Sequence, residues 1–491
     1  MILLLDTEKK LKFVCDQANS YDEWLEAATA YDDKLGHSRW KVYDQSTQYD
    51  FVSIRQRLDE LRSLRARHDH RGLLFTLNEG IHGNMGGMGK ALLYGRAMLG
   101  TKQLIIDYVD EIVDALELIA SDEVVDISFE EKLDFFRRAH HCFGSSAFMM
   151  SGSGLLLFFH VGVVKALSEQ GLLPNIISGA SGGSIVGSLV CTHTDKELKK
   201  LLNPEYFAKL ILSTPEIEEK ANRMIPPLIE IEEIHVIVKR LIPDMTFKES
   251  FEKTGRVLNI SVAPAETHQT SRLLNSTTTP NVLIRQSVLA SAAVPGIYPP
   301  VTLEARDSYG QRKAYLPSRK WVDGSVSDDM PTKRLARLYG VNHFIVSQTN
   351  PAVLPFVSDS LRPSGNRAII RSTVARTGRE WVNAAATIAR KPLQRNPSLH
   401  RASNLFLSLL NQNYLGDINL VPKNRFPNPF TLLAYPSAEK IARMMKDGEK
   451  STWGRMEMVR NQTKISRTLD AIVRDYEEDF MNIHKDKVQA G

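Results

Sequence analysis

The chain has 491 residues, 43% of them hydrophobic and 24% charged, and its formal net charge is +5. This composition is that of an ordinary globular protein, and the length predicts roughly three structural units. A charge of +5 is too small to indicate nucleic-acid binding. Cys15, Cys142 and Cys191 are odd in number and far apart, so they predict neither a disulfide framework nor a metal site and fit a reducing compartment.

Residues 1–145 are predicted to form a helical N-terminal domain. Apolar residues recur at helical spacing from Trp24 to Tyr31, from Ile54 to Leu64 and from Leu104 to Leu118, which is typical of helices packed on a core. The apolar start of the chain is too short for a signal peptide. The glycine-rich stretch 82–90 fails as a phosphate-binding loop, because Asn84 stands at the first glycine position and Ala91 follows the lysine.

Residues 146–350 are predicted to form an α/β domain with a mainly parallel sheet covered by helices, because short β-rich runs alternate with helical ones. The apolar stretch 147–164 contains a glycine turn and is therefore predicted to be a strand, a turn and a buried helix rather than a membrane span. Residues 198–247 are predicted to be a helical excursion that could lie over a site.

Residues 351–491 are predicted to be a basic, mostly helical C-terminal region. Arginines and lysines are frequent between 362 and 401, with interleaved apolar residues and Glu380 as the single acid among them. Two interpretations stay open for this stretch: a solvated face or mobile loop, and a basic amphipathic surface that meets anionic lipid.

The strongest chemical signal is the Gly-x-Ser-x-Gly motif formed by Gly179, Ala180, Ser181, Gly182 and Gly183. An apolar run precedes it and a helix-compatible run follows. Strand, sharp turn and helix are the context of a nucleophile elbow, whereas the pentapeptide alone also fits a simple Gly/Ser turn. Small residues are needed beside the serine because its backbone is strained there.

A serine nucleophile needs a base, and two arrangements are available. In the first, Asp323 ends an apolar run and is followed by Gly324 and Ser325, so it could sit at a strand terminus facing Ser181; an ordinary Asp-Gly turn is the alternative. In the second, Ser181, Asp323 and His343 follow the chain order of an α/β-hydrolase triad. His343 lies within a predicted strand, which favours a structural histidine, and His160 and His268 fit the triad order worse.

The tetrahedral intermediate of ester hydrolysis also needs hydrogen-bond donors for its oxyanion. Gly152, Ser153 and Gly154 precede a predicted helix, and backbone N–H groups in such a turn can bind an anion. The same stretch fails as a dinucleotide-binding loop, because Leu157 occupies the position of the third glycine.

In this arrangement of motifs the chain resembles the patatin-like phospholipases. The glycine loop, Gly-x-Ser-x-Gly and Asp-Gly-Ser occur in that family's order, and the further matches are His160 to Leu167, Ser291 to Gly296 and Phe344 to Pro351. The N-terminal third resembles the helical domain of plant and fungal triacylglycerol lipases, through Tyr21 to Trp24, Trp40-Lys41, Arg57-Leu58, Gly100 to Lys102 and Phe135-Phe136. Gly416 to Ile418, Thr452-Trp453 and Arg467 to Asp470 fit the tail of that subgroup.

The resemblance implies a lipid acyl hydrolase, a triacylglycerol lipase or phospholipase A, in which Ser181 is the nucleophile, Asp323 its base and residues 152–154 the oxyanion hole. It implies no metal or cofactor, and a cytoplasmic protein peripherally associated with a membrane or lipid droplet. Ser153 and Leu157 depart from the family's glycine loop, and a positive φ at Ser153 would strain it. A weakened or inactive lipid-binding pseudoenzyme therefore remains an alternative. A lysophospholipid transacylase is another, because the sequence does not determine whether the acyl group passes to water or to a lysophospholipid.

Overall fold

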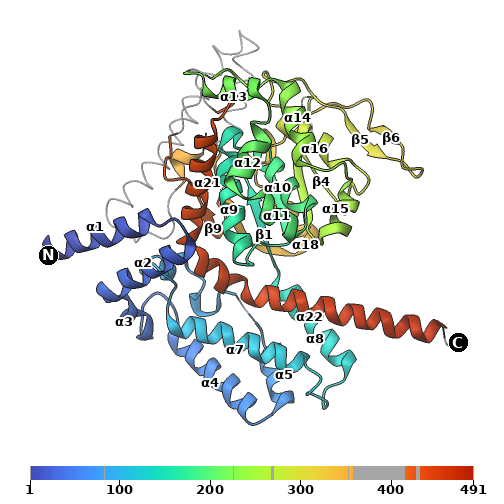
Figure 1. Ribbon diagram of the computed structural model, residues 1–491. Helices are drawn as coiled ribbons and strands as arrows, with labels where there is room; N and C mark the ends of the chain where they lie inside the picture. The colour runs from blue at the N-terminus through green and yellow to red at the C-terminus, as the bar shows by residue number, and fades with distance from the viewer. Residues whose placement is uncertain are drawn as a thin grey trace, which may run out of the picture.

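The computed structural model describes residues 2–81, 83–224, 226–266, 270–351, 353–357, 415–426 and 432–489. The basic stretch at 362–401 and His268 lie outside these residues. Within them, no helix combines the length and the apolarity needed to cross a membrane. Figure 1 shows a group of helices from the N-terminal part of the chain beside a second body that contains the sheet.

The N-terminal part consists of helices, as predicted. They are α1 (Ile2–Gln17), α2 (Tyr21–Lys34), α3 (His37–Val42), α4 (Phe51–Ala66), α5 (His70–Asn78), α6 (Ala91–Tyr94), α7 (Gln103–Ala120) and α8 (Phe129–Phe143), with a 3₁₀ turn η1 (Met85–Gly87). The apolar stripes of α2, α4 and α7 are buried where helical periodicity placed them. The glycine-rich stretch around η1 is a structural loop, in which the Asn84 side chain accepts a hydrogen bond from the Gly89 N–H at 2.9 Å.

Among the residues that the structure describes, the sheet has seven strands and is mainly parallel, which confirms the predicted fold class. Its strands are β1 (Ser145–Met150), β2 (Ile176–Gly179), β3 (Val257–Pro264), β4 (Arg272–Asn275), β7 (Trp321–Asp323), β8 (Val341–Ser347) and β9 (Ile418–Leu420). They are ordered β4-β3-β2-β1-β8-β9, and β7 also pairs with β3. Strands β3, β2, β1, β8 and β9 are mutually parallel, whereas β4 and β7 run antiparallel to β3.

Both faces of the sheet are covered because alternate side chains of a strand point to opposite faces. In β1, Phe148 and Met150 belong to one hydrophobic cluster, whereas Ala147 and Met149 belong to another that includes Leu335. Helices α9 (Leu157–Glu169), α10 (Gly182–Thr192) and α16 (Ile284–Ala292) pack on the first face, and α18 (Thr332–Tyr339) packs on the second. The apolar stretch 147–164 is thus divided among β1, a turn and α9, as predicted.

The predicted excursion between 198 and 247 is helical, and its helices lie at one side of the sheet body (Figure 1). It contains α11 (Asp195–Leu201), α12 (Pro204–Ile211), α13 (Pro215–Asn222), α14 (Ile231–Leu241) and α15 (Phe247–Thr254). Its loops are held by N-terminal caps such as the reciprocal hydrogen bonds between Thr246 and Glu249. A separate hairpin of β5 (Leu303–Arg306) and β6 (Arg312–Tyr315) projects from the body (Figure 1).

The C-terminal part of the chain packs against both the sheet body and the N-terminal helices. Strand β9 pairs with β8, and α21 (Ala438–Trp453) packs along α9. The long helix α22 (Met456–Gln489) then runs beside α7 and α8 (Figure 1). One hydrophobic cluster accordingly joins Leu58 in α4, Phe148 in β1 and Trp453 in α21.

Candidate functional site

Ser181 occupies a strained turn between β2 and α10. Its backbone has φ 51° and ψ −124°, and a non-glycine residue in such a conformation costs of order 1–3 kcal/mol. Its exposed fraction is 8%. The strand, turn and helix expected around Ser181 are therefore present, and the turn presents its side chain at the N-terminus of a helix.

The glycines around Ser181 are required by the close approach of the backbone. A Cβ atom on Gly179 would lie 2.3 Å from the carbonyl oxygen of Gly183, and a Cβ atom on Gly183 would lie 2.5 Å from that of Met150. Both distances are far below van der Waals contact. Any side chain at these two positions would thus push α10 away from the ends of β1 and β2.

Asp323 is the last residue of β7 and is 2% exposed. Its Oδ1 accepts a hydrogen bond from the Ser325 N–H at 2.8 Å. Burial raises the pKa of Asp323 to about 6, and hydrogen bonds with Ser325 and with the Ser181 side chain act in the opposite direction. The structure therefore brings together two residues that are 142 positions apart in the sequence, because β7 pairs with the end of β3, beside β2.

The glycine loop before α9 lies against the turn of Ser181. Ser153 Oγ is close enough to Gly182 that a Cβ atom there would lie 2.1 Å from it. The Gly152 N–H donates a hydrogen bond to Asp329 Oδ1 at 2.7 Å, so this donor is already engaged. Within the described ranges, the N–H groups of Ser153 and Gly154 donate no hydrogen bond, so both donors are unengaged.

The strain that a positive φ would cause at Ser153 is not present. Ser153 has φ −143° and the positive φ, 50°, falls on Gly154, so the serine carries no left-handed strain. Leu157 is half-buried and lines a cavity beside Ser181. Both departures from the family's glycine pattern are therefore accommodated by the backbone.

Ser181 lines a cavity whose walls are otherwise almost wholly apolar. The residues come from the glycine loop and α9 (Gly154, Leu155, Leu157, Phe158), from α10 (Gly182, Ile185), from the excursion (Ile211, Ile229, Ile234, Ile237, Val238, Leu241), from the end of α16 and the loop after it (Ala292, Val294, Tyr298) and from the segment before α21 (Leu432, Leu433, Pro436). No charged residue is among the described residues that line it. The excursion thus lies over the site, as predicted, and the side chains around Ser181 offer an apolar surface.

The histidines considered as bases for Ser181 make other contacts. His343 pairs in register with Ser146, near the start of β1, whereas Ser181 follows the carboxyl end of β2. Its ring nitrogens lie 3.0 Å from Ser146 Oγ and 3.0 Å from Gln462 Oε1. The Ser181–Asp323–His343 triad is therefore wrong, because the histidine lies toward the opposite end of the parallel strands.

His160 is a buried structural residue. Its Nδ1 lies 2.6 Å from Ser347 Oγ, and its Nε2 lies 3.1 Å from the Ser151 carbonyl oxygen and 3.0 Å from Thr349 Oγ1. Burial lowers the pKa of His160 to about 3, so the ring is neutral at physiological pH. It connects α9 to the loops that follow β1 and β8.

Sequence reasoning did not single out Asp329, and it gave no role to Asn350, which lies in the match from Phe344 to Pro351. Asp329 is buried, and its Oδ2 accepts a hydrogen bond from Asn350 Nδ2 at 3.0 Å. Burial raises the pKa of Asp329 to about 7, against hydrogen bonds from Asn350 and Gly152. The available signal was a pair of acidic residues, Asp328-Asp329, shortly after the Asp-Gly-Ser motif.

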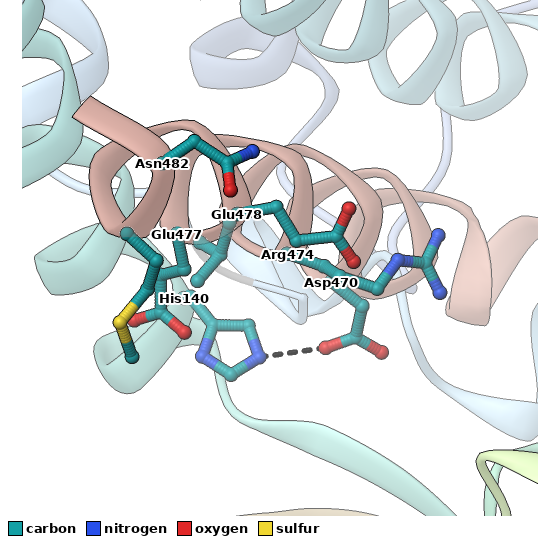
Figure 2. A pocket seen from close by; sticks show the side chains of 8 residues that line it. His140, Asp470, Arg474, Glu477, Glu478 and Asn482 are labelled. Atoms are coloured by element: carbon teal, nitrogen blue, oxygen red, sulfur yellow. Dashed lines mark hydrogen bonds and ion pairs between the residues drawn. The ribbon is translucent and has the colours of Figure 1, made fainter. Parts of the chain in front are cut away.

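A second hollow lies on the surface between α8 and α22 (Figure 2). Its charged side chains pair with neighbours: His140 Nε2 lies 2.6 Å from Asp470 Oδ1, and Glu477 pairs with Arg137 at 3.2 Å. The hydrogen bond with Asp470 raises the pKa of His140. This hollow lies on other elements than those around Ser181, and its two pairs link α8 to α22, whose apolar residues also belong to the core that contains α7 and α8.

Comparison with known proteins agrees with this combination of an α/β sheet, a strained serine turn and a buried carboxyl group. Residues 148–336 match the family model described as patatin-like phospholipase. Residues 3–141 match a model described as a domain of unknown function, DUF3336. The serine turn and Asp323 both fall within the first match, and the N-terminal helices fall within the second.

Curated relatives extend over nearly the whole chain. Triacylglycerol lipase ptl3 of Schizosaccharomyces pombe is 30% identical over 94% of this chain and 96% of its own length. Triacylglycerol lipase ptl2 of the same yeast is 30% identical over 94% of this chain and 75% of its own. The chain belongs to the patatin-like phospholipase family, which confirms the resemblance seen in its motifs.

The chain spans about half the length of other relatives. A patatin-like phospholipase domain-containing protein of Cryptococcus neoformans is 33% identical over 477 residues, which make up 94% of this chain and 54% of that protein. The aligned part includes the N-terminal helices as well as the α/β body, so the two are joined in this relative too.

Proposed function

We propose that this chain is a serine acyl hydrolase acting on lipid esters, with Ser181 as the nucleophile and Asp323 as the base. The observation that carries the proposal is the strained turn that holds Ser181 at the wall of an apolar cavity, with the buried Asp323 carboxyl group near enough for the Ser181 side chain to lower its pKa. This arrangement supports a nucleophile elbow paired with an acid instead of an imidazole.

In the proposed mechanism, the Asp323 carboxylate takes the Ser181 proton while the serine oxygen attacks the ester carbonyl carbon. The resulting oxyanion faces the unengaged N–H groups of Ser153 and Gly154, in the loop before α9. The protonated Asp323 then returns its proton to the departing alcohol oxygen. Water hydrolyses the acyl-serine by the same steps, and no metal or cofactor takes part.

The substrate class follows from the cavity and from the relatives' names. Apolar walls beside Ser181 favour a substrate with a hydrocarbon part. The relatives named above are a patatin-like phospholipase domain-containing protein and two triacylglycerol lipases. We propose an acylglycerol or phospholipid as the substrate, and a cytoplasmic enzyme that meets it at a membrane or lipid-droplet surface. The basic stretch 362–401 is proposed to make this attachment salt-sensitive with anionic vesicles.

The first test is covalent labelling by a fluorophosphonate, followed by hydrolysis of a soluble p-nitrophenyl ester. Wild-type protein should be labelled at Ser181 and hydrolyse the ester, whereas Ser181→Ala should do neither. Asp323→Asn should lose hydrolysis while remaining folded. Lipid binding without labelling would instead identify a lipid-binding pseudoenzyme.

His343→Ala provides the matched control for the choice of base. The dyad predicts retained turnover with a lower thermal unfolding midpoint, because the side chain ties β8 to β1 and α22. A panel of triacylglycerol and phospholipid substrates, with a lysophospholipid as added acyl acceptor, would then identify the substrate and distinguish hydrolysis from transacylation.

A further inference from the structure

Asp329 lies at the meeting point of three loops that follow strands of the sheet. Its Oδ1 accepts from the Gly152 N–H at 2.7 Å, in the loop after β1, and its Oδ2 accepts from Asn350 Nδ2 at 3.0 Å, in the loop after β8. Asp329 itself follows α17 (Ser325–Asp328), directly after β7. One buried carboxyl group therefore joins the glycine loop after β1 to the segment after β7 and to the segment after β8.

The same two loops are joined a second time by Ser151. Its Oγ accepts from the backbone N–H groups of Thr349 and Asn350 at 2.8 and 3.1 Å. These two hydrogen bonds fix Ser151, the residue before Gly152. The orientation of the next peptide group then depends on the hydrogen bond between Gly152 and Asp329. The loop has little space to move, because a Cβ atom on Gly152 would lie 2.9 Å from Ser325 Cβ.

We propose that Asp329 is a positioning residue for the oxyanion site. By accepting the Gly152 N–H, it takes this donor out of the predicted oxyanion hole and fixes the peptide, so that the N–H groups of Ser153 and Gly154 stay free toward Ser181. This inference rests on the proposed function. In it, Asp329 holds the glycine loop in place and does not itself contact the substrate. A misplacement of about 1 Å in such a site costs roughly 10²-fold in rate.

The hydrogen bond between Asp329 and Asn350 allows a test in which the carboxyl group and the amide group exchange places. In Asp329→Asn one carboxyl oxygen becomes an NH₂ group, which cannot accept from both Gly152 and Asn350. If the amide oxygen keeps the Gly152 bond, its NH₂ group faces the NH₂ group of Asn350. Combining this change with Asn350→Asp restores a donor opposite an acceptor while keeping the bond to Gly152.

The experiment measures kcat and KM on a soluble p-nitrophenyl ester for wild type, Asp329→Asn, Asn350→Asp and the double variant, with the thermal unfolding midpoint of each. Asp329→Asn should lower kcat by about 10- to 100-fold with KM changed less than about 3-fold, because the loss concerns the transition state. The double variant should recover most of kcat. Asp328→Asn is the matched control and should keep wild-type kcat, since Asp328 is partly exposed and pairs with Arg334.

Wild-type kcat in Asp329→Asn would overturn the inference and leave the proposed function intact. A folded double variant that is no better than Asp329→Asn would also overturn it. Wild-type protein that neither hydrolyses the ester nor reacts with the fluorophosphonate would overturn the proposed function, and this inference with it.

Discussion

The Ser181 N–H donates a hydrogen bond to Ser291 Oγ at 2.9 Å, and the Ser291 hydroxyl donates in turn to the Ser261 carbonyl oxygen at 2.8 Å. Ser291 is buried in α16. The strained turn therefore has its backbone donor satisfied by a side chain anchored on β3. This contact stabilises a conformation that the serine backbone would not adopt by itself.

Ser291→Ala should destabilise the protein and slow the labelling of Ser181. It leaves a buried N–H group without a partner, which costs about 1–3 kcal/mol. Ser287→Ala, one turn earlier on α16, removes only a side-chain bond to the Leu283 carbonyl oxygen and serves as the control. Thermal unfolding and fluorophosphonate labelling rates compare the two, and equal effects would contradict the assigned role of Ser291.

The pKa of Asp323 predicts how activity depends on pH. A base must be ionised to accept the serine proton, and burial raises the pKa of this carboxyl group to about 6. The value of kcat/KM for a soluble ester should therefore rise with pH through about 6 and level off above it. A profile that is flat between about pH 5 and pH 8 would exclude Asp323 as the base.

The same shift predicts that Asp323→Asn stabilises the protein at neutral pH. The carboxyl group has a pKa of about 6 in the folded state and about 3.9 when unfolded, so ionisation costs stability as pH rises from about 4 to about 6. Above that range the cost reaches about 3 kcal/mol at most. The unfolding midpoint of Asp323→Asn should exceed that of wild type at pH 7.5, and the difference should shrink toward pH 4.

The crossing of α9 and α21 predicts a strong effect of a single methyl group. A Cβ atom on Gly162 would lie 1.8 Å from the Met445 carbonyl oxygen, whereas the nearest atom to a Cβ on Gly454, at the end of α21, is 4.0 Å away. Gly162→Ala should lower the unfolding midpoint by an amount equivalent to about 3 kcal/mol or more. Gly454→Ala should leave it unchanged, and similar midpoints for the two variants would contradict the close packing.

Ile237 and its neighbour test whether the apolar cavity holds the acyl chain. Ile237 lines the cavity on α14, whereas Val236 is 40% exposed and lies outside the lining. Ile237→Phe should reduce hydrolysis of long-chain esters by about tenfold relative to short-chain ones. A change in the fit of a hydrocarbon group to an apolar pocket alters the free energy of the transition state by about 1–3 kcal/mol. Val236→Phe should leave the ratio of the two rates unchanged; an equal change in both variants would argue against this cavity as the acyl site.

Local patterns predicted the central part of the site. The strand, turn and helix around Ser181 could be predicted because each is encoded by a few neighbouring residues, and the apolar stripe from Ile54 to Leu64 identified its helix for the same reason. Asp323 was found because a glycine follows it after a short apolar run. The prediction that Asp323 lies beside Ser181 was based only on the order of the motifs in the chain. In the structure, the pairing of β7 with β3 brings Asp323 to the end of the sheet where Ser181 lies.

The supporting residues could not be predicted in this way. Asp329 bonds to Gly152, which is 177 positions earlier, and nothing near either residue indicates the pairing. Either Ser153 or Gly154 could take the positive φ of this turn, and the sequence does not specify which of them does. Leu432 and Leu433 have no distinguishing pattern, although both line the cavity.

The Leu432 carbonyl oxygen accepts the Leu155 N–H at 2.7 Å, and the Ile229 N–H donates to the Leu433 carbonyl oxygen at 2.8 Å. A wall of the cavity is thus supplied nearly a hundred residues after position 336, where the match to the family model ends. A transcript interrupted by a stop codon between residues 352 and 415 would retain the whole match to the family model, with the glycine loop, the serine turn and Asp323. Its product would lack β9 and this wall, so a gene catalogue based on that match would count as intact a protein whose cavity is open on one side.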